Sequence, residues 1–243
     1  MTKDSNYSRY NAWFRKVNPL PIERQFRVFD NYFRRNYLAY MPKTRGARIL
    51  ELGCGRGQFL HFLRSEGYTN VVAIDLDPEH VAQCRGFGYE VSVADMNAFI
   101  PTCEDASFDM VVMNDLIEHV ARTEAVTLLE AIRVKLRPGG RLFIKTCNCN
   151  NPLGMATFFS DFTHLEGYAP LKLEHLAAIT GYVDCSCSNL ITYPNIILID
   201  PIYAALFQAS WLWKRIMFTA NGKVADRVFS KGFLAVLKAP ASP

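Results

Sequence analysis

A cluster of three glycines, Gly53, Gly55 and Gly57, separates a short apolar run over 48–52 from an amphipathic stretch over 57–67. Glycine tolerates a positive φ and lets the main chain come close to a ligand. A helix that begins directly after such a turn also directs its free N–H groups toward that ligand. This feature predicts a strand, a glycine turn and a helix around a small-molecule site.

The chain continues with short apolar runs that alternate with longer amphipathic ones. Further strands are expected over 71–75, 90–93, 108–113, 141–145, 182–187 and 232–237, and further helices from 78 onward, over 123–136 and over 171–180. Strands joined by helices predict a doubly wound, mostly parallel α/β sheet that is Rossmann-like and covered on both faces. Helices on either side of Pro19 and Pro21, and a helical insertion before the last strand, complete the expected architecture.

Charge is distributed unevenly along the 243 residues, although the net charge is only +4. Residues 1–48 carry a net charge of +8, residues 49–190 a net charge of −8, and residues 191–243 a net charge of +4. Such segregation indicates parts with different tasks. We therefore expect a basic, aromatic helical lid over 1–45, a core over 46–191 and 230–238, and an apolar, aromatic cap or insertion over 192–229.

The chain shows features expected of a cytoplasmic protein. A polar stretch, with no apolar run after it, follows Met1, and the longest clean apolar run, Ile202–Trp213, is 12 residues long. A spanning helix needs roughly 20 such residues. The seven cysteines are scattered through apolar contexts, as in a reducing compartment. Tryptophans mixed with cations over 211–218 leave a peripheral contact with the inner face of a membrane open.

Acidic residues follow two of the expected strands. Asp75 ends the second strand, where a carboxylate can accept hydrogen bonds from both hydroxyls of a ribose. Asp95 follows the third strand and suits the exocyclic amine of a base. Leu76 and Met96 come directly after these acids and could sandwich an adenine ring. With Asn114 after the fourth strand, these residues predict a crevice shaped for a nucleoside.

Successive motifs resemble those of class I S-adenosylmethionine-dependent methyltransferases: ARILELGCGRGQFL, VVAIDLD, VADM, FDMVVMNDLIEHV and LRPGGRLFIKT. The glycine spacing differs from the G-x-G-x-x-G turn of nicotinamide enzymes. The resemblance implies a seven-stranded sheet with one reversed strand near an edge, and S-adenosyl-L-methionine as cofactor. It implies that Glu51 and the three glycines hold the methionine part, Asp75 the ribose, and Asp95 with Met96 the adenine. Asn114 would lie beside the sulfonium.

A sulfonium methyl group is already activated, so such an enzyme mainly aligns the acceptor, and a hydroxyl acceptor also needs a base. We expect His119, His164 and Asp161 to be the catalytic residues. The run Asp115-x-x-Glu118-His119 resembles the E-x-x-E-H arrangement of ubiquinone-pathway and small-RNA O-methyltransferases, some of which use a metal. No metal is assigned here. The alternative is that the site holds a divalent ion. Asp115, Glu118 and His119 would share one face of a helical turn, and His164 would join them from a distant part of the chain.

The acceptor is predicted less directly. The segment over 161–182 resembles methyltransferases of bacterial glycan and O-antigen biosynthesis, which implies an oxygen of a surface-glycan sugar. The basic, aromatic ends suit a small or lipid-linked acceptor that is anionic or amphiphilic. The alternatives are a quinone or other aromatic hydroxyl, RNA, and, in a different class, a non-catalytic binding module. Methylation of adenine N6 in nucleic acids is disfavoured, because the Asn/Asp-Pro-Pro-Tyr motif of that reaction is absent after the fourth strand, where Asn114-Asp-Leu-Ile stands instead.

Overall fold

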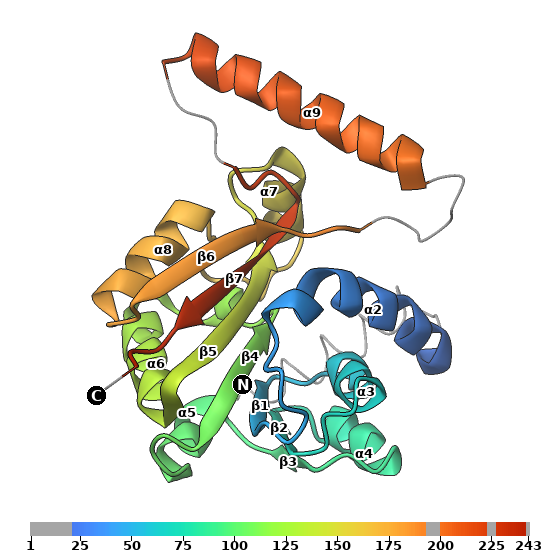
Figure 1. Ribbon diagram of the computed structural model, residues 1–243, viewed down its shortest axis with the longest axis vertical. Coiled ribbons are helices and arrows are strands. Elements are labelled where there is room, and N and C mark those ends of the chain that lie inside the picture. Colours follow the sequence, from blue (N-terminus) through green and yellow to red (C-terminus); the bar gives the residue numbers. More distant parts are fainter. Residues whose placement is uncertain (1–20, 193–199, 223–226, 242–243) are drawn as a thin grey trace.

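The computed structural model describes residues 21–192, 200–222 and 227–241. Within these ranges a seven-stranded sheet has the order β3-β2-β1-β4-β5-β7-β6 (Figure 1). Strands β1 to β5 pair in parallel, and β7 runs antiparallel to β5 and β6. This sheet confirms the predicted fold class, including the reversed strand. The strands are β1 (Ile49–Leu52), β2 (Val71–Asp75), β3 (Val91–Val93), β4 (Phe108–Asn114), β5 (Leu136–Cys147), β6 (Asp184–Asn189) and β7 (Gly232–Lys238).

Helices cover both faces of the sheet. One face carries α2 (Ile22–Tyr37), α3 (Gln58–Ser65) and α4 (Pro78–Gly86), and the other carries α5 (Met96–Phe99), α6 (Arg122–Lys135) and α8 (Pro170–Ile179). The remaining helices are α7 (Pro152–Phe159), α9 (Asp200–Ala220) and the short 3-10 turns η1 (Leu38–Tyr40), η2 (Ile100–Thr102) and η3 (Ile117–His119). The helix expected from 78 onward begins as predicted, because the Asp77 side chain accepts a hydrogen bond from the Glu79 N–H at 2.9 Å.

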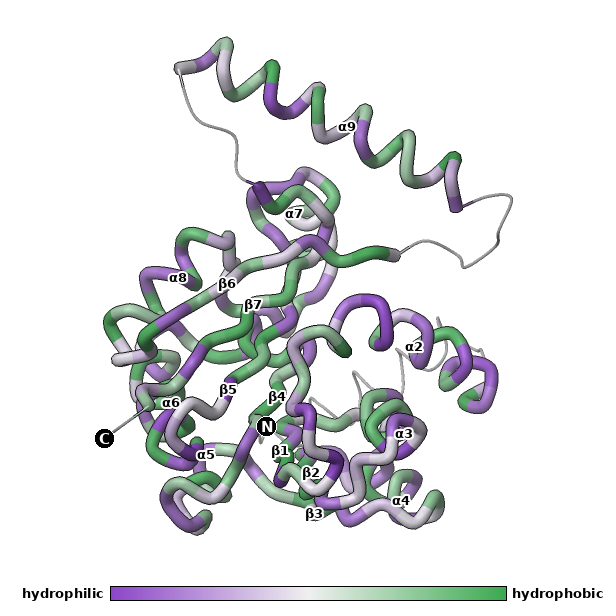
Figure 2. Tube along the Cα trace, in the orientation of Figure 1, coloured by the Kyte–Doolittle hydropathy of each residue, from purple (hydrophilic) through white to green (hydrophobic). Residues whose placement is uncertain are grey.

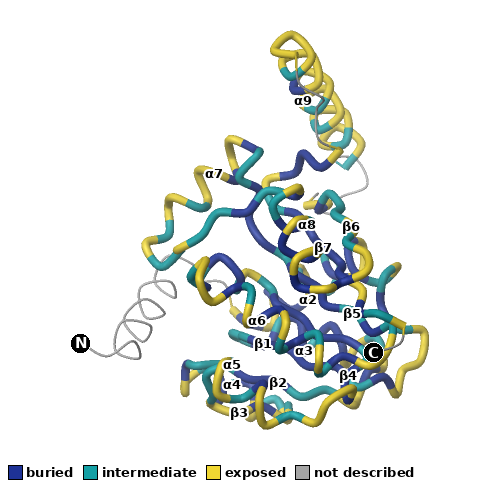
Figure 3. Tube along the Cα trace, turned by 90° about the vertical axis from the view of Figure 1, so that its left-hand side faces the viewer, coloured by how far each residue is buried: buried dark blue, intermediate teal, exposed yellow. Residues whose placement is uncertain are grey.

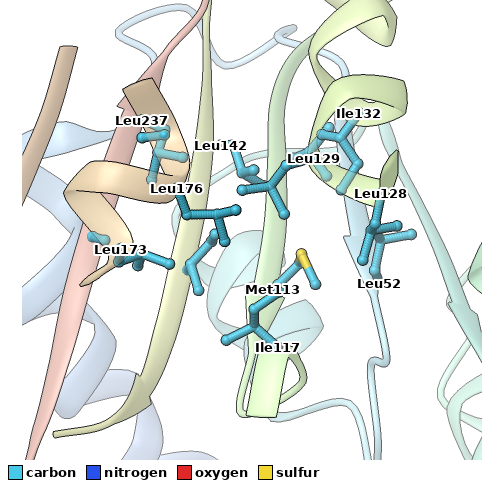
Figure 4. Packing of buried hydrophobic residues seen from close by; sticks show 14 of the residues in the cluster. Leu52, Met113, Ile117, Leu128, Leu129, Ile132, Leu142, Leu173, Leu176 and Leu237 are labelled. Carbon is cyan, nitrogen blue, oxygen red and sulfur yellow. The ribbon is translucent and has the colours of Figure 1, made fainter. Parts of the chain in front are cut away.

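Alternation along the strands builds two cores. In β4, Val111 and Met113 face the α6 and α8 side, whereas Met110 and Val112 face the α2 and α3 side. Successive side chains of a strand point to opposite faces, so a strand buried on both faces is apolar throughout. Figure 2 shows this concentration of hydrophobic residues along the central strands, and Figure 4 shows side chains of α6 and α8 packed against the sheet.

Two local features differ from the prediction. Strand β5 begins at Leu136, five residues before the strand expected over 141–145, so Pro138, Gly139 and Gly140 lie inside it. The register of β4 against β5 shifts there, and Gly139 has a φ of 73°. The glycines thus form a bulge rather than a turn before the strand. Helix α7 is an addition to the prediction, and the Asn151 side chain caps it by accepting from the Leu153 and Gly154 N–H groups.

The segment predicted as a cap or insertion, 192–229, contains α9. This 21-residue helix lies apart from the sheet and is exposed along most of its length (Figures 1 and 3). Among the helices expected around Pro19 and Pro21, α2 directly follows Pro21, while 1–20 lies outside the described residues. Over the part of the chain that the structure describes, the helices are too short or too polar to cross a membrane.

Candidate active site

A cavity of about 1240 Å³ opens beyond the carboxyl ends of β1, β4 and β5, bordered by α2 and by α7 with the loop after it. Ligands of open α/β sheets bind at this edge. Six of the residues predicted from the sequence line the cavity: Gly53, Gly55, Asn114, His119, Asp161 and His164. The others are not among its lining residues: Glu51, Gly57, Asp75, Leu76, Asp95 and Met96.

The glycine turn between β1 and α3 requires glycine at each of its three positions. Gly53, Gly55 and Gly57 have φ values of 70°, 52° and 84°, which other residues rarely adopt. A Cβ on Gly57 would also lie 2.9 Å from the Cys84 Sγ atom, whereas a Cβ on Gly55 would meet no atom within 4 Å. The main chain at Gly55 therefore borders open space.

Asp75 holds the glycine turn in place. Its Oδ2 atom accepts a hydrogen bond from the Gly55 N–H at 2.7 Å, and its Oδ1 atom accepts one from the Asp77 N–H at 2.8 Å. The Nδ1 atom of His80, which lines the cavity, lies 3.5 Å from Oδ1. The carboxylate thus connects the end of β2 to the backbone that borders the cavity.

Glu51 and Asn114 carry buried polar atoms below this turn. The Glu51 Oε2 and Asn114 Nδ2 atoms have no hydrogen-bond partner among the described residues. Burial raises the pKa of Glu51 well above its ordinary value. The Asn114 Oδ1 atom is satisfied, because the Tyr37 hydroxyl donates to it at 2.5 Å. A ligand that donates a hydrogen bond to Glu51 and accepts one from the Asn114 amide would satisfy both buried atoms.

The residues predicted to hold adenine lie apart from the cavity lining. Asp95 caps α5 by accepting from the Asn97 N–H at 2.8 Å, and Met96 packs against the core on the α6 side. Leu76 follows β2 directly. Their roles stay predictions.

His119 and His164 come together from distant parts of the chain. Their ring centroids lie 4.8 Å apart in an edge-to-face arrangement. The Nδ1 atom of His119 lies 3.2 Å from the Thr163 carbonyl oxygen, and that of His164 lies 2.9 Å from the Phe158 carbonyl oxygen. A carbonyl oxygen only accepts, so both Nδ1 atoms carry the proton and both Nε2 atoms keep a lone pair while the rings are neutral.

Asp161 supports the two histidines. Its Oδ1 atom accepts hydrogen bonds from the Thr163 N–H at 2.8 Å and from the Thr163 hydroxyl at 2.6 Å. The same hydroxyl lies 3.1 Å from the His119 Nδ1 atom, and the Asp161 Oδ2 atom lies 3.9 Å from the His164 Nε2 atom. Burial and the neighbouring His164 lower the pKa of His119, which favours its neutral form.

The alternative metal set is not assembled. The described residues contain no group of three or more histidine, cysteine, aspartate or glutamate side chains that could hold a metal ion. The expected helical face over 115–119 is wrong, because η3 is a 3-10 turn and Asp115 has a φ of 49°. Asp115 instead accepts a hydrogen bond from the Lys145 ammonium group, and the buried Glu118 accepts one from the Thr146 hydroxyl at 3.0 Å.

Known proteins match about half of this chain, or less, in sequence. The family described as "Methyltransferase domain" matches residues 49–140, which include the glycine turn, Asp75 and Asn114. A ubiquinone biosynthesis O-methyltransferase of Xylella fastidiosa (strain M23) is 35% identical over 124 residues. Residues 49–140 form a methyltransferase domain. S-adenosylmethionine is the cofactor that the motifs of this domain imply. The aligned residues are 49% of the chain and 49% of that relative, so the chain spans about half the length of the curated relative it matches.

Solved structures match the methyltransferase over most of its length. An S-adenosylmethionine-dependent methyltransferase from Archaeoglobus fulgidus superposes with a TM-score of 0.69 at 18% identity, covering 94% of this chain and 99% of that one. Phosphoethanolamine N-methyltransferase 2 of Haemonchus contortus, in complex with S-adenosyl-L-methionine, has a TM-score of 0.57 at 19% identity, covering 88% of this chain and 56% of that one. At sequence identities this low, the structural similarity shows a shared fold and nothing further.

The geometry of the methyltransferase fits its cofactor. The incompletely bonded Glu51 carboxyl suits the ammonium end of an amino acid, and the Asn114 amide, which the sequence predicts to lie beside the sulfonium, offers a further hydrogen-bond donor. The open space beside Gly55, next to the carboxylate of Asp75, accommodates a ligand against the main chain. These residues would hold the methionine and ribose parts, as the sequence predicts.

Several residues and contacts of the site were not predicted from the sequence. Tyr37 reaches Asn114 across 77 positions of the chain, and Lys145 reaches Asp115 across 30. Arginines of α2 also line the cavity: Arg24, Arg27 and Arg35. The arginines and aromatics interleaved over 1–45 indicated a role for the arginines of α2. A single sequence does not predict the pairing of Tyr37 with Asn114 or of Lys145 with Asp115.

Proposed function

We propose that this methyltransferase moves a methyl group from S-adenosylmethionine to a hydroxyl oxygen of a small or lipid-linked acceptor. The observation that carries the proposal is one cavity that is lined both by Gly53, Gly55 and Asn114 and by the histidine pair. When bound, the cofactor supplies a methyl group on a cationic sulfur. The chain must then orient the acceptor, exclude water and remove the proton of the hydroxyl.

The histidine pair supports proton removal. Both Nδ1–H groups donate to backbone carbonyl oxygens, which leaves the Nε2 lone pairs of His119 and His164 available to an acceptor hydroxyl. Asp161 lies beside the His164 Nε2 atom, where its negative charge stabilises an imidazolium. His119 and His164 thus serve as the general base, and Asp161 with Thr163 orients them.

The acceptor that we favour is a phenolic hydroxyl on an amphiphilic molecule. Two curated relatives that match half of the chain are named for ubiquinone biosynthesis, which supports a quinone-type hydroxyl over the surface-glycan sugar expected from the sequence. The cations that line the cavity suit an anionic group on the acceptor: Arg24, Arg27, Arg35, Arg56 and Lys231. We therefore place the aromatic hydroxyl first and the sugar second.

A labelled-methyl assay tests this function. The purified chain receives S-adenosylmethionine labelled in its methyl group together with a prenylated phenol, a lipid-linked sugar or RNA. We expect label on the phenol oxygen, and a loss of about 100-fold in turnover for His119→Ala or His164→Ala with cofactor affinity unchanged. Label only on the sugar or RNA would overturn the acceptor assignment, and binding of cofactor without turnover of any extract of the source cell would overturn the enzyme.

A further inference from the structure

One face of α2 lines the cavity and is basic. The positions 24, 27, 28, 31 and 35 recur at helical spacing, and their residues all line the cavity: Arg24, Arg27, Val28, Asn31 and Arg35. The two acidic residues of α2, Glu23 and Asp30, are not among the lining residues. The helix therefore directs positive charge, and none of its own negative charge, toward the cavity.

The charge of the cavity lining is not balanced. Six lysine and arginine side chains and three acidic side chains are among the described residues that line it. Each of the acidic side chains already accepts a hydrogen bond, from Lys145, the Thr146 hydroxyl or the Thr163 hydroxyl. The cofactor does not neutralise the excess, because S-adenosylmethionine has two cationic groups and one carboxylate. The cavity thus suits a further, anionic ligand.

Arg24 and Arg27 are the cations of this face that are available to such a ligand. Arg35 donates to the Asp200 carboxylate at 3.0 Å. The guanidinium groups of Arg24 and Arg27, by contrast, make no hydrogen bond or ion pair with the residues that the structure describes. Residues three positions apart are neighbours on a helix surface. Two neighbouring guanidinium groups offer the forked donors that match a carboxylate or a phosphate.

The two arginines lie far along α2 from the predicted position of the sulfonium. At the N-terminal end of α2, the Gln25 Oε1 atom accepts a hydrogen bond from the Gln58 Nε2 atom of α3 at 3.0 Å. At the other end, the Tyr37 hydroxyl donates to the Asn114 Oδ1 atom at 2.5 Å. Ten positions separate Arg27 from Tyr37, which is about 15 Å along a helix. A group held by the arginines is therefore distant from the transferred methyl group.

Aromatic side chains of α2 line the cavity between these two ends. The rings of Phe29 and Tyr32 both line it and meet edge to face, with their centres 6.1 Å apart. We propose that Arg24 and Arg27 bind a carboxylate or phosphate group of the methyl acceptor, whose apolar part lies against these two rings. The arginine pair is called the α2 subsite below. The proposal rests on the proposed function, because the anionic group belongs to the acceptor of that reaction.

Calorimetric titration of the full chain, saturated with S-adenosylhomocysteine, tests the α2 subsite. Each of three probes joins a phenol through about eight methylene groups to a carboxylate, a phosphate monoester or a neutral primary amide, so that it spans about 15 Å. We expect both anionic probes to bind at least about tenfold more tightly than the amide. The more tightly bound anion identifies the group that the arginines recognise.

Two variants of α2 locate the effect. Arg24→Gln/Arg27→Gln should remove the preference for the anionic probes and leave the affinity for the amide unchanged. The matched control is Arg34→Gln, which removes an exposed arginine of the same helix that donates to Glu66 and does not line the cavity. This control should keep the preference. Salt gives a measurement without any variant: raising it from about 50 to 500 mM should weaken the anionic probes and not the amide.

Other results overturn the α2 subsite. It fails if the three probes bind the unaltered chain equally at both salt concentrations, or if Arg34→Gln loses the preference as fully as the double variant. If the double variant weakens S-adenosylhomocysteine as much as the anionic probes, the arginines hold the carboxylate of the cofactor instead. Methyl transfer to the probes is assayed separately. Transfer without preference for an anion would overturn the α2 subsite alone, whereas anion-dependent binding without transfer supports it and overturns the phenolic acceptor.

Discussion

Two buried glutamates, Glu51 of β1 and Glu118 of η3, differ in how their carboxyl groups are bonded. Burial raises the pKa of both, to about 8 for Glu118 and well above the ordinary value for Glu51. Glu118 accepts a hydrogen bond from Thr146, whereas the Glu51 Oε2 atom has no such partner in the described parts of the chain. A buried carboxyl without a partner costs free energy unless a ligand supplies one.

The comparison assigns different tasks to the cofactor part of the site, which contains Glu51, and to the acceptor part, which contains Glu118. Glu51 is incompletely bonded and suits a cationic ligand, whereas Glu118 lines the cavity, is internally bonded and supports the backbone that carries His119. The cofactor part follows local sequence motifs, and the acceptor part is assembled from η3, α2 and the loop after α7. Substitutions at matched positions can therefore separate ligand binding from structural support.

The largest effect is expected at Asp75. Asp75→Ala removes the acceptor for the Gly55 N–H of the glycine turn and for the Asp77 N–H after β2, together with the predicted ribose contact. Hydrogen bonds to a charged group contribute about 1.5–3 kcal/mol each, so S-adenosylmethionine affinity should fall by about 100-fold or more. Isothermal titration calorimetry measures this, with Asp105→Ala as control, because Asp105 is an exposed partner of Lys135 far from the turn. Equal affinities of the two variants would remove Asp75 from the cofactor site.

A direct contrast of the two glutamates comes next in size. Glu51→Gln removes the negative charge that a cofactor ammonium group would meet, and we expect S-adenosylmethionine affinity to fall by about 10- to 100-fold. Glu118→Gln keeps the acceptor for Thr146 and should leave cofactor affinity unchanged. Calorimetry in buffers of different ionisation enthalpy adds a second readout. Binding should release up to about one proton in the unaltered chain and none in Glu51→Gln. The same loss of affinity in both glutamine variants would contradict the contrast.

The next prediction concerns Glu118 alone and compares how the melting temperature depends on pH with and without its carboxyl group. The folded-state pKa of Glu118, about 8, lies above its value in the unfolded chain, so the folded state holds the extra proton. The resulting stability is complete below the unfolded pKa and is lost as the pH rises through about 8. We expect the melting temperature of the unaltered chain to fall by at least about 4 °C more over this rise than that of Glu118→Gln. Glu124→Gln, at an exposed site of α6, should follow the unaltered chain; parallel curves for all three proteins would contradict the assignment.

The cofactor part of the site was predictable because its determinants are local. The glycine turn, the Asp77 cap and the alternation of β4 depend on residues within a few positions of one another, so one sequence predicts them. The acceptor part depends on contacts across the chain. The pairing of Tyr37 with Asn114 and the meeting of His119 with His164 follow from how α2 and the loop after α7 pack. The histidines were predicted as catalytic from a resemblance, but their shared position and their tautomers required the fold.

A smaller effect is expected where the two parts of the site meet. Tyr37→Phe removes the donor to the Asn114 Oδ1 atom and keeps the buried ring among Phe33 and Phe59. A hydrogen bond of about 1 kcal/mol is lost, so S-adenosylmethionine affinity should decrease about fivefold. Tyr68→Phe is the control: its hydroxyl also donates at 2.5 Å, to the Pro42 carbonyl oxygen, but lies outside the cavity lining. The control should lower stability and leave affinity intact, and a fivefold loss in both would show that the effect is on the fold.

The smallest effect is expected at the attachment of α9, which extends the comparison from the cavity to the whole molecule. Arg35 and Asp200 are both partly exposed, and such an ion pair contributes at most about 1 kcal/mol. Asp200→Asn should shift the melting temperature by no more than about 4 °C, because the core of the sheet is untouched. Amide hydrogen exchange should instead rise in α9 and stay constant in β4, since α9 has few contacts with the body. Faster exchange in β4 would mean that α9 is part of the cooperative core, and the division between a packed sheet and an outlying helix would then be wrong.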